Sequence, residues 1–114
     1  MKIINKTRNT VLGKDVNIAD SPFSRMKGLL GKREFSKGQA LLIKPCNSIH
    51  TFFMRFSIDV LFLDRDSRVI KVINCFRPFR FSAIYFKAAS AIELPCGTIQ
   101  SSSTQEGDEI SLTP

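Results

Sequence analysis

The sequence contains no tryptophan, one tyrosine and one histidine, and its three cysteines are widely spaced. No Cys-x-x-Cys pair is present, so neither a zinc ribbon nor a thioredoxin-type site is encoded. Cys46, Cys75 and Cys96 are instead expected to be buried, reduced thiols that act as small hydrophobic residues. A zinc site formed by the three cysteines and His50 is the alternative. We expect no metal and no other cofactor.

Long apolar runs are also absent. No segment is apolar over the length that a membrane span needs, and residues 1–6 lack the apolar centre of a secretion signal. We therefore expect a protein that does not insert into a membrane and that is cytoplasmic, with a mature form trimmed of a targeting segment as the alternative. Acidic residues are few, with 10 against 17 basic residues and a net charge of +7. Because the basic residues are scattered, this excess is typical of a solvated surface, although it also attracts polyanions.

The 114 residues are 43% hydrophobic, which is enough for one domain over residues 1–114 with a single core. Short apolar segments separated by turn residues predict a mainly β fold. It is a β-rich α+β domain with a sandwich or barrel-like antiparallel sheet and one or two short helices. The expected strands are residues 3–7, 10–19, 39–44, 49–54, 60–63, 69–74, 83–86, 89–94 and 109–113.

Four predictions are more specific. Residues 49–54 are apolar on both faces, as in a central strand, and residues 60–74 form a hairpin. A helix is expected over residues 21–31, with Ser21 as N-cap, Pro22 in its first turn and Gly31 just past its end. Its apolar stripe would consist of Phe23, Met26, Leu29 and Leu30. The polar composition of residues 96–105 indicates a loop, with a short helix as the alternative.

Four separated motifs share an order and spacing with a known family. They are Arg25-Met-Lys-Gly-Leu-Leu-Gly, Gly38-Gln-Ala-Leu-Leu, Phe53-Met-Arg-Phe-Ser-Ile-Asp-Val-Leu-Phe-Leu-Asp, and Ala91-Ile-Glu-Leu-Pro-Cys-Gly-Thr-Ile followed by Gly107-Asp108. Over residues 10–112 the sequence resembles the DUF192 (UPF0127) proteins, which have no assigned activity. The resemblance implies a mainly β fold with short helices, one of them after Gly97. Phe53 stands where tryptophan is common in that family.

Two ionisable residues interrupt the apolar segment 48–64. Asp59 lies between Ile58 and Val60, and a buried carboxylate is costly unless it is paired or hydrogen-bonded. Its partner would be Arg55, Arg25 or a set of backbone N–H groups. His50 either donates to a carbonyl at the edge of the core or pairs with Cys46 or Asp59 as a general base.

These residues define a candidate ligand site of Arg25, His50, Met54, Arg55 and Asp59. A guanidinium group binds carboxylates and other oxyanions through two parallel hydrogen bonds. We therefore expect a non-enzymatic binding or accessory protein that holds a small anionic ligand or a protein partner. The alternative is an enzyme that uses Asp59 or His50 as an acid or base.

Residues 76–81, Phe-Arg-Pro-Phe-Arg-Phe, alternate aromatic rings with guanidinium groups. Rings beside positive charge favour single-stranded nucleic acid, with Arg77, Phe79 and Arg80 as the contacting residues. The same residues also fit a connection or a strand at the edge of a sheet. In that case Pro78 would interrupt the strand, and the arginines would keep the exposed edge from aggregating. Weak nucleic-acid binding is therefore a further alternative.

Overall fold

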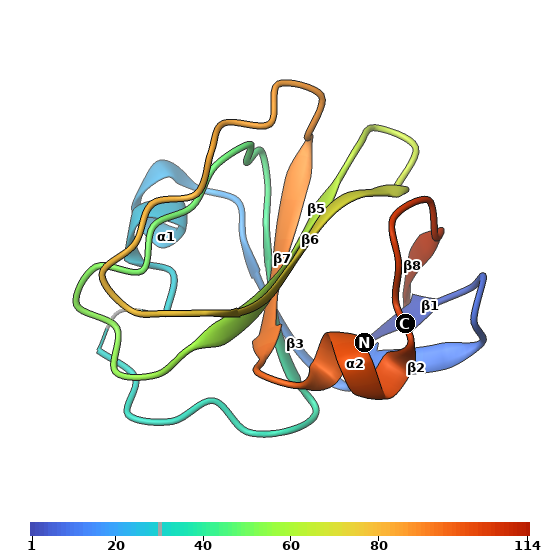
Figure 1. The fold of residues 1–114 in the computed structure, drawn as a ribbon, viewed down its shortest axis with the longest axis horizontal. Coiled ribbons are helices and arrows are strands. Elements are labelled where there is room, and N and C mark those ends of the chain that lie inside the picture. The colour runs from blue at the N-terminus through green and yellow to red at the C-terminus, as the bar shows by residue number, and fades with distance from the viewer. Residues whose placement is uncertain (30) are drawn as a thin grey trace.

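The protein folds into two β-sheets and two short helices in a computed structural model that describes residues 1–29 and 31–114 (Figure 1). In chain order the elements are β1 (Lys2–Asn5), β2 (Thr10–Gly13), β3 (Asp15–Ala19), α1 (Pro22–Lys27), β4 (Gln39–Ile43), β5 (Ile58–Leu63), β6 (Val69–Phe76), β7 (Ser90–Pro95), α2 (Thr98–Ser102) and β8 (Ile110–Thr113). No helix in this described part is long and apolar enough to cross a membrane.

The smaller sheet has the strand order β2-β1-β8, and the larger has the order β3-β4-β7-β5-β6. All strand pairs are antiparallel except β3 and β4, which run parallel with Asp15 opposite Gln39. The parallel pair arises because the chain leaves β3, passes through α1 and returns before it enters β4. The mainly β fold with two short helices is confirmed, with this one departure from an antiparallel arrangement.

The larger sheet is buried on both faces, which is why every residue of β5 is buried. One face packs against the smaller sheet and α2 through a core that includes Ile3, Leu61 and Ile99. The other face packs against Leu29, just beyond α1, and the long connections before β5 and after β6 through a second core. Figure 1 shows α1 and α2 on opposite sides of the larger sheet. The site described below lies in the second core.

Residues 49–54 are not a strand, so that prediction is wrong. Thr51 is fully buried, and its Oγ1 donates to the Arg77 carbonyl at 2.6 Å and accepts from the Arg80 N–H at 3.0 Å. Its backbone N–H donates to the Arg80 carbonyl at 2.9 Å, and its carbonyl accepts from the Phe79 N–H at 2.9 Å. These bonds join two irregular connections, residues 50–54 and 77–81, which we call the clamped loops. Residues 83–86, also predicted as a strand, form another irregular connection.

The helix α1 begins as predicted, with Ser21 as its N-cap and Pro22 in its first turn, but it ends at Lys27 rather than before Gly31. The predicted apolar stripe is wrong, because Phe23 and Met26 are 77% and 71% exposed. Leu29, just beyond the helix, is buried, and Leu30 lies outside the described residues. Residues 98–102, predicted from composition as a loop, form α2, in agreement with the family resemblance.

Two of the three cysteines are not reduced thiols, which corrects that prediction. Cys75 and Cys96 form a disulfide with a Cα–Cα distance of 4.8 Å, and both residues are exposed. The strands β6 and β7 flank β5, and Ile58 of β5 pairs with Phe76 on one side and with Pro95 on the other. Cys75 and Cys96 are the chain neighbours of these two residues. Cys46 is a free, half-buried thiol.

Candidate functional site

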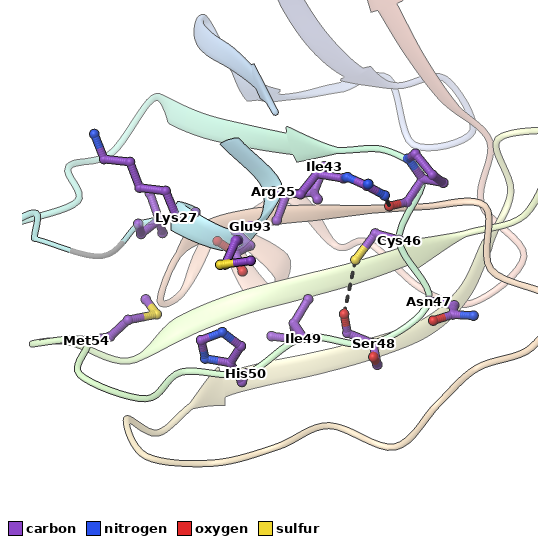
Figure 2. A pocket seen from close by; sticks show the side chains of 14 residues that line it. Arg25, Lys27, Ile43, Cys46, Asn47, Ser48, Ile49, His50, Met54 and Glu93 are labelled. Atoms are coloured by element: carbon purple, nitrogen blue, oxygen red, sulfur yellow. Dashed lines mark hydrogen bonds between the residues drawn. The ribbon is translucent and has the colours of Figure 1, made fainter. Parts of the chain in front are cut away.

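A pocket of about 340 Å³ opens between α1, β4, β7 and the connection that follows β4 (Figure 2). This volume is at the lower end of the range typical of small-molecule sites. Its polar lining comes from separate elements of the fold and includes Arg25, Cys46, His50 and Glu93. We call it the Glu93 pocket.

Glu93 is the central residue of this pocket. It lies in β7 between Leu41 of β4 and Val60 of β5, so its side chain emerges on the face of the larger sheet that carries the second core. The residue is 3% exposed, and its Oε1 has no hydrogen-bond partner among residues 1–29 and 31–114. Burial raises the pKa of this carboxyl from 4.5 to about 8. Glu93 is therefore mostly neutral at pH 7.

Arg25 reaches the same pocket from α1 and is half-buried. Its Nη1 donates to the Pro45 carbonyl at 3.1 Å, and its Nε donates to the Ser21 carbonyl at 3.4 Å. These contacts hold the guanidinium group across the pocket, above Cys46 in Figure 2. Within the described residues Arg25 forms no ion pair with Glu93. The pocket thus holds one fixed cation and one neutral acid.

Cys46 and His50 both line the pocket. Within the described residues no hydrogen bond joins their side chains. The Cys46 Sγ donates to the Ser48 carbonyl at 3.1 Å, and burial raises the pKa of this thiol. His50 is exposed, and its Nδ1 accepts from the Phe52 N–H at 3.3 Å. The geometry therefore lacks the thiol-to-imidazole bond of a nucleophile and base.

Three of the five residues predicted for a ligand site come together, since Arg25, His50 and Met54 all line the Glu93 pocket. Arg55 is exposed and does not line it. Asp59 is fully buried, but it pairs with Leu94 in a register that directs its side chain toward α2, on the opposite face of the sheet. The predicted set therefore divides between two faces of the larger sheet.

Asp59 has a structural environment. Its Oδ1 accepts from the Cys75 N–H at 2.8 Å, and its Oδ2 accepts from the N–H groups of Gly97 and Ile99 at 3.1 and 2.8 Å. Of the two bonding modes expected from the sequence, the structure has the set of backbone N–H groups. One Asp59 oxygen and the sulfurs of Cys75 and Cys96 lie within 4.8 Å of one another. The two sulfurs are bonded to each other, and the carboxylate accepts hydrogen bonds from three backbone N–H groups. The cluster therefore connects β5, β6 and the start of α2.

Glu93 was not among the predicted site residues, although it carries the same signal as Asp59. Both are single acids within apolar strands, in Ile92-Glu93-Leu94 and Ile58-Asp59-Val60. The sequence gives no means of telling which acid has backbone donors and which has none, because those donors come from distant segments. A search for every acid flanked by apolar residues would have found both.

The clamped loops present an exposed surface of aromatic and basic residues beside the Glu93 pocket. Phe53, Phe79 and Phe81 are 76%, 51% and 74% exposed, and Arg77 and Arg80 are exposed beside them. The Phe53 and Phe79 rings meet edge to face with centroids 5.7 Å apart. Both residues also have positive φ, near 63° and 61°, which is uncommon for residues other than glycine. We call this the aromatic surface.

A small β-rich domain with a buried acid at the floor of a pocket is therefore the class of protein that the fold and site define. The chain matches the family DUF192, described as Uncharacterized ACR, COG1430, over residues 3–112, and it belongs to that family. This confirms the resemblance drawn from its four motifs.

The curated relatives are UPF0127 proteins from archaea. The protein PH1112 from Pyrococcus horikoshii is 36% identical over 113 residues, covering 95% of this chain and 96% of its own. A UPF0127 protein from Thermococcus sibiricus is 37% identical over 112 residues, covering 95% and 72%. None of these names states an activity.

Two solved structures share the fold. A protein of unknown function from Novosphingobium aromaticivorans superposes with a TM-score of 0.86 at 15% identity, covering 98% of this chain and 84% of its own. A putative transcription regulator from Sinorhizobium meliloti superposes with a TM-score of 0.78 at 20% identity, covering 96% and 89%. At these identities the comparison establishes the fold alone.

Proposed function

We propose that this chain is a non-enzymatic binding or accessory domain that holds a small ligand in the Glu93 pocket. The observation that carries the proposal is the carboxyl group of Glu93, which lines the pocket and has an oxygen without a partner among the described residues. A buried polar group in this state costs free energy until another group hydrogen-bonds to it. A bound small molecule supplies that partner, and the apolar walls bury the rest of it.

The enzymatic alternative has less support. A general base must come within hydrogen-bond reach of the substrate proton, directly or through one water. Asp59 faces away from the pocket and already accepts three backbone N–H groups. His50 lies at the pocket, but no hydrogen bond connects it to Cys46 or to an acid in the described part of the chain. A binding role needs neither connection.

A ligand screen by NMR tests the proposal. Small acids, amines, amides and sugars are added separately to the ¹⁵N-labelled full chain, and the backbone signals of Gly28, Cys46 and Glu93 are followed. We expect at least one class to move these signals in a saturable manner and to be recovered chemically unchanged after long incubation. Glu93→Leu, which keeps a similar volume without the carboxyl group, should lose the response, whereas the exposed-site variant Glu106→Gln should keep it. Conversion of the bound compound would establish an enzyme instead.

A second candidate function, weak binding of single-stranded nucleic acid, is favoured by the aromatic surface. Exposed rings bind bases by stacking, and neighbouring arginines bind the phosphate backbone. Phe79 and Phe81 are exposed together with Arg77 and Arg80, as this mode of binding requires. The Thr51 hydrogen bonds support the surface by fixing the two loops relative to each other.

Fluorescence anisotropy with a labelled oligothymidine tests this second candidate. The double variant Arg77→Ala/Arg80→Ala should weaken binding and flatten its dependence on salt, because each lost phosphate contact reduces the salt slope by about one. A double variant of two exposed lysines elsewhere, Lys14→Ala/Lys32→Ala, is the matched control. Equal losses in the two double variants would reduce the interaction to general charge attraction.

A further inference from the structure

We infer that the ligand of the Glu93 pocket is a small organic anion whose carboxylate or similar oxyanion accepts a hydrogen bond from the Glu93 carboxyl group and pairs with Arg25. This inference rests on the proposed function, because it names the class of ligand for the same pocket. It follows from the charges around the pocket, the protonation of Glu93, the anchoring of Arg25 and the composition of the walls.

The charged and titratable groups that line the pocket favour an anion. From α1 come Arg25 and Lys27, and from the connection after β4 come Cys46 and His50. The strands β4 and β5, which flank Glu93, place Leu41 and Val60 opposite it and so contribute no charge there. With the Cys46 thiol kept neutral by burial, the lining carries a positive charge and no negative one at neutral pH. A cationic ligand would have to approach Arg25, whereas an anion is attracted by it.

The neutral form of Glu93 suits an anion equally well. A protonated carboxyl group has one O–H donor, whereas an ionised one only accepts hydrogen bonds and repels a negative ligand. Glu93 is 3% exposed and has no cation within ion-pairing distance among the described residues, so removal of its proton is costly. A carboxylic acid held neutral by an apolar site can donate to an oxyanion. Ligand binding and proton retention by Glu93 are therefore coupled.

Arg25 and the pocket walls define the rest of the ligand. Two carbonyl contacts, from Pro45 and Ser21, fix the guanidinium group and leave part of its donor set for an oxyanion. The Lys27 side chain extends away from Glu93 in Figure 2. The buried side chains of Ile43, Ile49 and Met54 form apolar walls. A carboxylate on a short hydrocarbon chain matches both parts of the pocket.

A titration with butyrate, butylamine and butanamide tests the inference, because these probes share a four-carbon chain and differ in charge. The full chain is titrated at pH 6 and pH 9 while the NMR signals of Gly28, Cys46 and Glu93 are followed. We expect butyrate to bind best of the three. Its affinity should fall about 10-fold between pH 6 and pH 9, because only about one tenth of Glu93 retains its proton at pH 9 when its pKa is about 8. Arg25→Gln should weaken butyrate binding at both pH values.

Glu93→Gln separates hydrogen bonding from titration, because the amide donates but does not ionise in this range. This variant should lose most of the fall in butyrate affinity between pH 6 and pH 9, and any change that remains belongs to the other titratable lining groups, Cys46 and His50. Stronger binding of butylamine than of butyrate, or butyrate affinity that does not change with pH in the unsubstituted protein, would overturn the inference while leaving a ligand pocket in place. Failure of every probe of this panel and of the screen above to move the pocket signals would overturn the proposed function as well.

Discussion

Replacement of Glu93 by glutamine should make the stability of this protein less dependent on pH. The pKa of Glu93 is raised by burial from 4.5 to about 8 in the folded state. Below pH 4.5 both folded and unfolded chains hold the proton, so Glu93 imposes no ionisation cost. Between pH 4.5 and 8 the unfolded chain loses the proton while the folded chain keeps it, and the free energy of unfolding falls by up to about 1.4 kcal/mol per pH unit. Above pH 8 the full cost, at most about 5 kcal/mol, is present.

Urea denaturation followed by circular dichroism, from pH 5 to pH 9 without reductant, measures this effect, since the protein has no tryptophan to report unfolding. The difference in unfolding free energy between Glu93→Gln and the unsubstituted protein cancels the titration of other groups. We expect this difference to shift in favour of the variant by about 3 kcal/mol between pH 5 and pH 8. The exposed-site variant Glu106→Gln should show no such trend. A difference for Glu93→Gln that stays constant across this range would refute the interpretation of Glu93 as a buried neutral acid.

Three further substitutions test the structural interactions around the site by chemical denaturation. Asp59→Ala removes the acceptor of three backbone N–H groups, of which that of Ile99 is buried, and should lower the free energy of unfolding by about 3 kcal/mol; a loss below about 1 kcal/mol would contradict its role. Replacement of Cys75 and Cys96 by serine should cost about 3 kcal/mol, given the sequence separation of 21 residues. Thiol titration of the unfolded, unreduced protein should count Cys46 alone, and a count of three would refute the disulfide. Thr51→Val removes the side-chain bonds between the clamped loops and should cost about 2 kcal/mol, whereas an unchanged stability would show that the loops need no clamp.

The parts of the fold that could be predicted are those determined by local sequence. Residues 60–74 form a hairpin because two apolar segments flank a polar turn, in which the Asp64 side chain accepts from two backbone N–H groups. The start of α1 was also predictable, since Ser21 and Pro22 act within one turn. Residues 49–54 show the limit of this reasoning. Their apolar composition indicates burial correctly at Ile49, Thr51 and Met54, but it does not distinguish a strand from a connection fixed by Thr51.

Sequence reasoning named some of the residues that line the Glu93 pocket and missed others. Arg25, His50 and Met54 meet in one pocket because α1 and the connection after β4 cover the same face of the larger sheet. The separation of Asp59 from this pocket, and the presence of Glu93 in it, depend on strand register. In β5 and β7, adjacent residues point to opposite faces, so a shift of one residue would exchange the two faces of the sheet. Register of this kind is set by pairing between distant strands, which one sequence does not reveal.

The pairing of β1 with β8 bears on how this protein can be re-engineered. Lys2 lies opposite Thr113, so residues near the two ends of the given sequence are neighbours across one antiparallel ladder. A short glycine-rich linker between them, with new ends cut into the turn at residues 64–67, would give a circular permutant with the same two sheets. In such a permutant β8 and β1 would be joined as a hairpin. A tag for immobilisation would then be attached at the new ends in residues 64–67, and no longer beside β1 and β8.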